Sequence, residues 1–145
     1  MDIKNTIKQG CISDYGSCPF ISNISNAARQ NSNFRTAFWT GNHLQMTLMC
    51  IPVCGEIGAE VHPETDQYIR VETGQAFVRM GTAKDRMCFK RQLNAGDAVF
   101  IPCGTWHNIS NAGNCSLKLS SIYAPPHHPR GTVHRTRTDA EHEHY

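Results

Sequence analysis

The chain has 145 residues, which is enough for one domain with a hydrophobic core. Its formal net charge is +2, and its lysines and arginines are scattered rather than gathered in a basic stripe, so we do not expect nucleic-acid binding. No apolar run approaches the roughly 20 residues that a membrane span needs, and the N-terminus lacks the apolar segment of a signal peptide. We therefore expect a cytoplasmic protein that does not bind membranes.

The first 33 residues are predicted to form an N-terminal arm with a short helix. The first part of this arm is polar and interrupted by glycine and proline, which predicts an irregular segment docked through Phe20 and Ile21. Asn23 or Ser25 is predicted to cap a helix over Asn26–Gln30, since their side-chain oxygens can accept hydrogen bonds from the first free amides.

From Phe34 the pattern is that of short β-strands. Within one of them Leu44, Met46, Leu48 and Cys50 alternate with Gln45, Thr47 and Met49, so the two sets lie on opposite faces. The predicted strands are Phe34–Trp39, Leu44–Ile51, Ile57–His62, Gln67–Thr73, Gln75–Met80, Met87–Leu93, Asp97–Ile101, Trp106–Ser110 and Ser116–Tyr123. Turn residues recur about every 8–12 residues, which predicts an all-β sandwich or barrel over residues 34–124.

Residues 125–145 are predicted to form a C-terminal extension. Prolines at 125, 126 and 129 exclude regular structure in its first part. Its last residues, Thr138–Tyr145, are charged and polar, and we expect them to be frayed.

The seven cysteines lie at positions 11, 18, 50, 54, 88, 103 and 115, an odd number with no CxxC pair. In a reducing compartment they are predicted to be free thiols, several of them acting as small buried apolar residues. Cys103 is the one cysteine that is a candidate for chemistry, because it lies four residues before His107.

A group of possible metal ligands lies near the middle of the chain. Glu60 and His62 are two residues apart, so an extended backbone places both side chains on one face of a sheet. A turn follows, and Gln67 opens the next strand and can fold back toward the same point. His107 is a fourth candidate. The carboxylates of the turn, Glu64 and Asp66, could support the metal ligands from behind, but we expect them to be ordinary turn carboxylates.

These residues resemble two sequence motifs of the cupin family. Gly58–Gly74 resembles the first motif, although Glu60 stands where the first histidine is usual and Gln67 stands where glutamate is usual. His62 occupies the position of the second histidine. The second motif matches in full, with Gly96, Pro102, Gly104, His107 and Asn111.

The chain is also similar to small single-domain cupins that are often labelled phosphomannose-isomerase-like. The shared runs are Thr-Asp-Gln at 65–67, Gly-Thr-Trp-His-Asn at 104–108 and Ile-Tyr-Ala-Pro-Pro at 122–126. This resemblance implies a double-stranded β-helix, or jelly-roll, barrel. It also implies a homodimer, in which the N-terminal arm could cross to the partner.

The resemblance further implies one divalent metal ion held by Glu60, His62, Gln67 and His107. This set supplies one carboxylate and three neutral donors, the same ligand charge as the three histidines and one glutamate that are usual in cupins. Two histidines and a carboxylate with open positions suit zinc, iron(II), manganese or nickel.

Three functions are compatible with such a site. The first is a metal-dependent enzyme of isomerase or lyase type that acts on a small sugar-like or carbonyl substrate. The second is an iron(II) dioxygenase that uses Glu60, His62 and His107 as a facial triad. The third is a non-catalytic protein that binds a small molecule. The sequence identifies no general acid or base, so the catalytic residues stay unknown.

Other aromatic and histidine residues have less specific patterns. Tyr123 ends a predicted strand, where packing is the usual role of tyrosine, and Trp106 could line a pocket or pack in the core. The remaining histidines are irregularly spaced and are expected to form a surface or dimer-interface cluster rather than a second metal site: His43, His127, His128 and His134.

Overall fold

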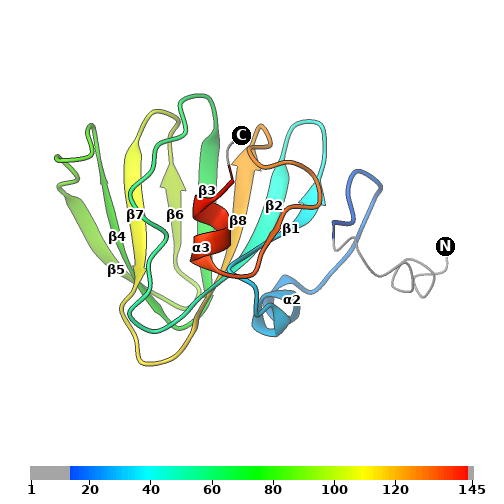
Figure 1. The fold of residues 1–145 in the computed structure, drawn as a ribbon, viewed down its shortest axis with the longest axis horizontal. Coiled ribbons are helices and arrows are strands. Elements are labelled where there is room, and N and C mark those ends of the chain that lie inside the picture. The colour runs from blue at the N-terminus through cyan, green and yellow to red at the C-terminus, as the bar shows by residue number, and fades with distance from the viewer. Residues whose placement is uncertain (1–13, 144–145) are drawn as a thin grey trace.

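The computed structural model describes residues 14–143, which form two antiparallel sheets facing each other as a barrel (Figure 1). One sheet has the strand order β6-β3-β8-β2-β1-β9, and the other has the order β5-β4-β7. The strands are β1 (Arg35–Thr40), β2 (Gln45–Ile51), β3 (Asp66–Thr73), β4 (Gln75–Gly81), β5 (Phe89–Asn94), β6 (Ala98–Ile101), β7 (Trp106–Asn111), β8 (Leu117–Ala124) and β9 (Val133–His134). The predicted all-β jelly-roll fold is confirmed.

Eight of the nine predicted strands are present, with ends shifted by one or two residues. The exception is Ile57–His62, which is irregular and touches β7 through isolated bridges at Glu56 and Glu60. The contact with β7 is interrupted at Gly58, whose φ of 103° lies in the left-handed region and whose amide donates to the Asn108 side chain instead of a strand carbonyl. The predicted bend at Gly74 is confirmed, with a φ of 94° between β3 and β4.

The N-terminal arm is held against the outer face of the larger sheet. Helix α2 (Ile24–Gln30) begins after Asn23, whose side chain accepts a hydrogen bond from the Asn26 amide, as predicted for a cap. Ser25 donates to the buried carboxylate of Glu72 on β3, which ties the helix to the sheet. Phe20 docks by stacking on Tyr15, whereas Ile21 is 98% exposed and does not dock as expected.

The C-terminal extension is more regular than expected. Residues 125–132 carry no helix or strand, as the prolines predict, but β9 then pairs with β1. A short helix, α3 (Arg137–Glu141), follows, so the prediction of a frayed segment from Thr138 is wrong for residues 138–141. The reason is a capping box, in which Thr136 and Asp139 satisfy each other's backbone amides. In Figure 1 the helix lies across the front of the barrel.

The barrel interior is polar at one end and apolar at the other. Neighbouring residues on β2, β8 and β3 form rows across the sheet, because paired residues share a face. From one end to the other the rows are Gln45–Tyr123–Gln67, then Thr47–Ser121–Ile69, then Met49–Leu119–Val71, then Ile51–Leu117. All these side chains are buried. The apolar rows form the core, and the polar rows mark the end at which a functional site can lie.

This gradient explains the alternation seen in the sequence of β2. The predicted two faces exist, but the polar face that carries Gln45 and Thr47 turns into the barrel. Leu48 lies on the other face and is only 2% exposed, and helix α2 contacts β2.

The six described cysteines are all free, as predicted, and Cys11 lies outside the described residues. The expectation that several are buried is wrong, since Cys50 is half-buried and the other five are exposed. Among the described residues, no helix is long and apolar enough to cross a bilayer.

Candidate metal centre

Glu60, His62 and His107 come together at the polar end of the barrel. Glu60 and His107 are fixed opposite each other by a reciprocal pair of backbone hydrogen bonds, each 2.9 Å long. His62 lies two residues further along and its carbonyl accepts from the Gly104 amide at 2.8 Å. One ligand atom from each of the three side chains lies within 4.8 Å of the others, a spacing that one metal ion can bridge.

The nitrogen atoms of both histidines are prepared to coordinate an ion. His107 Nδ1 donates to the Thr105 carbonyl at 2.9 Å, which leaves Nε2 as the ring nitrogen that faces the cluster. His107 Nε2 and both ring nitrogens of His62 are buried without a hydrogen-bond partner among the described residues. Buried polar atoms are rarely left in this state, so these atoms fit a bound cation.

Gln67 presents its amide oxygen in the same way. Its Nε2 donates to Ser121 Oγ at 2.9 Å, which fixes the orientation of the amide. Its Oε1 is buried and, within residues 14–143, has no hydrogen-bond donor. The side chain is 3% exposed and lies in the interior row beside Tyr123. An oxygen in this position fits a weak neutral ligand to a divalent ion.

Glu60 supplies the negative charge of the site. Its Oε1 lies 3.3 Å from His107 Nε2 and 3.5 Å from His62 Nε2. Burial raises the pKa of Glu60, but the contacts with His107 and His62 outweigh burial, so the pKa falls far below its usual value. The carboxylate therefore remains ionised at neutral pH and can act as an anionic ligand.

The C-terminal extension adds three histidines beside this cluster. The His127 ring lies 4.2 Å from the His62 ring, and His128 Nε2 lies 3.3 Å from the Tyr123 hydroxyl. His128 and His134 are 8% and 1% exposed, so the expectation of a surface cluster is wrong for both. The extension folds back along the barrel and β9 pairs with β1, which buries them. His43 is exposed, as expected.

Burial also governs the charge of these groups. Desolvation, with help from the nearby charge of Arg35, lowers the pKa of His128 to about 2. Desolvation likewise lowers the pKa of His127 and raises the pKa of Tyr123. All three are therefore neutral at pH 7, and Glu60 and Arg35 carry the charge in this part of the barrel.

A cavity of about 210 Å³ reaches the cluster at Glu60, which is the one proposed ligand among its lining residues. It lies between the barrel and the C-terminal extension, and Glu60, His127, Arg35 and Arg137 are among its lining residues. Arg35 was not singled out in the sequence, yet it is a charged residue of β1 with only 5% exposure. Arg35 is the one charged residue of β1, and this was the available clue.

The remaining candidates lie outside the cluster. Glu64 is exposed, and Asp66 accepts a hydrogen bond from the Cys103 amide at 2.8 Å, so both are turn carboxylates as expected. Cys103 is exposed and takes part through its backbone. Trp106 is half-buried at the start of β7, and Tyr123 is 1% exposed and packs edge-on against His62.

Comparison with known proteins identifies the family. Residues 47–123 match the family model described as Cupin domain. The chain is 52% identical over 129 residues to the uncharacterized protein YrkC of Bacillus subtilis, a match that covers 89% of this chain and 69% of YrkC. The crystal structure of BH2720 from Bacillus halodurans matches with a TM-score of 0.88 and 50% identity, covering 90% of this chain and 98% of that one.

More distant structures share the fold. KdgF from Halomonas sp. has a TM-score of 0.57 and 22% identity, covering 64% of this chain and 80% of its own. At this identity the likeness concerns the barrel alone. The family model and the two close relatives, together with the possible metal site at Glu60, His62 and His107, lead to one conclusion: the chain belongs to the cupin family.

Proposed function

We propose that this cupin holds one divalent metal ion through Glu60, His62, Gln67 and His107, and that it is an enzyme of isomerase or lyase type. One observation carries the proposal. Four side chains, from a loop, β3 and β7, direct a carboxylate, two imidazoles and an amide oxygen to the polar end of the barrel, and three of them bear buried atoms without hydrogen-bond partners in residues 14–143.

The chain's own residues prepare this site in three ways. Thr105 sets the tautomer of His107, and Ser121 orients the Gln67 amide. Burial keeps His127, His128 and Tyr123 uncharged beside the ligands. A divalent ion bound there would act as a Lewis acid toward a carbonyl or hydroxyl oxygen of a small substrate. The cavity beside Glu60 gives such a substrate a place to bind.

The ligand set supports a second candidate. Glu60, His62 and His107 form a two-histidine, one-carboxylate group, which is the donor set of iron(II) oxygenases, and Gln67 is a weak ligand that exchanges readily. The two candidates differ in their cofactor requirement. An oxygenase consumes dioxygen when loaded with iron(II) and not with zinc, whereas an isomerase or lyase turns over without dioxygen.

The test is a screen of small sugars and keto acids with protein loaded separately with zinc, manganese, nickel and iron(II). We expect turnover by the wild-type chain and its loss in His62→Ala, with oxygen uptake recorded in parallel. Metal-dependent binding with no turnover of any compound would contradict the enzymatic proposal and favour a non-catalytic binding protein.

A further inference from the structure

Arg35 is a charged residue beside the metal centre that the proposed function does not use. Its side chain is 5% exposed, and its guanidinium lies 5.4 Å from the centre of the Phe34 ring. Its Nη1 lies 3.1 Å from His134 Nδ1, and its Nε is buried with no hydrogen-bond partner in the described part of the chain. No described carboxylate forms an ion pair with Arg35 directly.

Glu143 is linked to Arg35 through His134. Glu143 Oε2 accepts from His134 Nε2 at 2.8 Å, and the other ring nitrogen faces Arg35. The contacts from Arg35 to His134 and from His134 to Glu143 fix the position of the guanidinium. Within residues 14–143 they leave the guanidinium without direct contact to a carboxylate, and a buried cation in this state is unfavourable unless an anion pairs with it.

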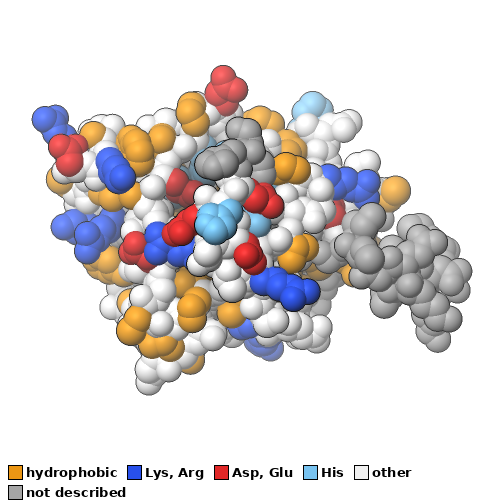
Figure 2. Space-filling view, viewed as in Figure 1, with side chains coloured by type: hydrophobic (Ala, Val, Ile, Leu, Met, Phe, Trp, Pro, Cys, Tyr) orange, Lys and Arg blue, Asp and Glu red, His pale blue; other side chains and the backbone are white. Residues whose placement is uncertain are grey.

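Arg35 and the metal ligand Glu60 line the same cavity. The other charged groups along its wall are Arg137 and Glu141, which pair with each other at 3.2 Å. Without a metal ion the charges of Arg35 and Glu60 balance. A divalent ion at Glu60 leaves the cavity with a surplus of two positive charges, of which Glu143 behind His134 offsets one. Figure 2 shows acidic, basic and histidine side chains gathered around α3 on this face.

We infer that this cavity binds a small carboxylate, whose charged group is held by Arg35 while a second oxygen of the same molecule faces the metal centre. The inference rests on the proposed function and names its substrate class. Guanidinium groups bind carboxylates through parallel N–H donors, and Arg35 retains donors beyond Nη1. The cavity of 210 Å³ corresponds to about seven water molecules, which suits a small hydroxy or keto acid rather than an oligosaccharide.

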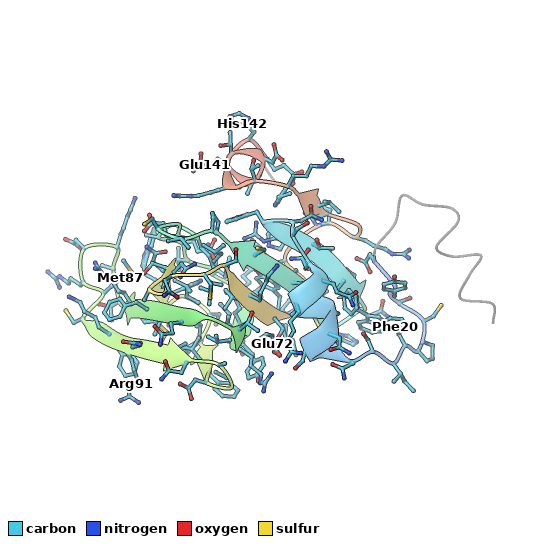
Figure 3. All side chains as sticks on the ribbon, turned by 90° about the horizontal axis from the view of Figure 1, so that it is seen from below. Phe20, Glu72, Met87, Arg91, Glu141 and His142 are labelled. Atoms are coloured by element: carbon cyan, nitrogen blue, oxygen red, sulfur yellow. The ribbon has the colours of Figure 1, made fainter. Side chains whose placement is uncertain are left out.

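The test uses the full chain, Zn²⁺, and a matched pair of probes. Glycolate carries a carboxylate and a hydroxyl, and glycolamide has the same shape without the charge. Calorimetry measures both affinities for the zinc-loaded wild type, for Arg35→Gln and for Arg91→Gln. Arg91 lies on the exposed β5, on the opposite side of the molecule from α3 in Figure 3, so Arg91→Gln removes the same charge far from the cavity.

We expect Arg35→Gln to weaken glycolate binding about 10- to 100-fold, the effect of losing a charged hydrogen-bond donor. Glycolamide affinity should change less than about 3-fold, and Arg91→Gln should behave as wild type. Zinc affinity should not fall, because a positive charge has been removed. Equal glycolate affinity in zinc-loaded wild type and zinc-loaded Arg35→Gln would overturn the inference.

Two further measurements separate the possible failures. If the wild type takes up no zinc, the proposed function fails, and glycolate is then titrated into the metal-free chain. Glycolate binding that Arg35→Gln weakens would support the carboxylate subsite. Absence of glycolate binding, or binding that Arg35→Gln leaves unchanged, would overturn the subsite. If Arg35→Gln does not fold, the Nε–H signal of Arg35 in the ¹⁵N-labelled wild type decides. It should shift with glycolate and not with glycolamide, and a signal that responds to neither would refute the role of Arg35.

Discussion

Replacement of His107 by alanine should remove most of the stabilisation that a metal ion gives to the fold. The His107 side chain is 1% exposed, and its Nε2 lies 3.3 Å from Glu60 Oε1, so no solvent-exposed group can take its place. Loss of one of two imidazole ligands should weaken metal binding at least about 100-fold, since changes to groups that merely support a ligand already cost 10- to 100-fold.

The expected effect on stability follows from mass action. At a zinc concentration about 100 times the wild-type dissociation constant, binding adds about 2.7 kcal/mol to the free energy of unfolding. A 100-fold weaker variant at the same zinc concentration gains only about 0.4 kcal/mol. For a chain of this size these values correspond to rises in Tm of about 10 °C and about 1 °C.

Differential scanning calorimetry with and without zinc measures both shifts in the same protein. Comparing the zinc-induced shift, rather than Tm itself, removes the separate effect of the cavity that His107→Ala creates. His43→Ala is the matched control, since it removes an exposed imidazole and should keep the full shift. A full zinc-induced shift in His107→Ala would refute the assignment of this residue as a ligand.

Three more predictions follow from the structure. Because the pKa of Glu60 is lowered, its carboxylate stabilises the metal-free fold at pH values above the ordinary pKa of 4.5. This contribution is lost as the pH falls toward the folded-state pKa. The free energy of unfolding from urea titrations should therefore fall more for the wild type than for Glu60→Gln between neutral pH and about pH 3. An equal fall in the two proteins would argue against the contact of Glu60 with the histidines. Gln67→Leu should weaken zinc binding less than about 10-fold in a chelator competition, because an amide oxygen is a weak ligand; a loss as large as that of His107→Ala would make Gln67 a main ligand. Glu72→Ala should lower the free energy of unfolding by about 1–3 kcal/mol, since the carboxylate is buried and accepts from Ser25 and Ser120, whereas the exposed Glu64→Ala should change it by less than about 0.5 kcal/mol.

Much of the fold was predictable because it follows from local patterns. Alternating apolar residues, turn residues and glycines predicted eight strands. Asn23, one of the two predicted caps, does cap α2, although the helix begins at Ile24 rather than at Asn26. The segment Ile57–His62 was wrongly predicted as a strand, since its alternation is real but only single bridges join it to β7. Its role is to carry Glu60 and His62 to the site, and two isolated contacts are enough for that.

The ligand cluster was also predictable, because motif spacing reports which strands converge. The surroundings of the cluster were not. His127, His128 and His134 reach the interior only because β9 pairs with β1 a hundred residues earlier in the chain, and two-residue strands leave little trace in a sequence. Arg35 shares that limitation, since its burial depends on the same pairing.

Dimer formation and cytoplasmic location stay predictions, as does the division into an arm, a barrel and an extension at residues 33 and 124. The extension contributes a strand to the larger sheet and a wall to the cavity. Removal of residues 125–145 should therefore alter both the fold and the site.

The most direct measurement is the metal content of untagged protein after reloading, determined by elemental analysis on the wild type and on a Glu60→Ala, His62→Ala double variant. Both proteins keep the same C-terminal histidines, so adventitious binding there contributes equally. We predict about one tightly held divalent ion per wild-type chain and almost none in the double variant. Less than about a tenth of an ion per wild-type chain, or equal content in the two proteins, would contradict a metal centre at these residues.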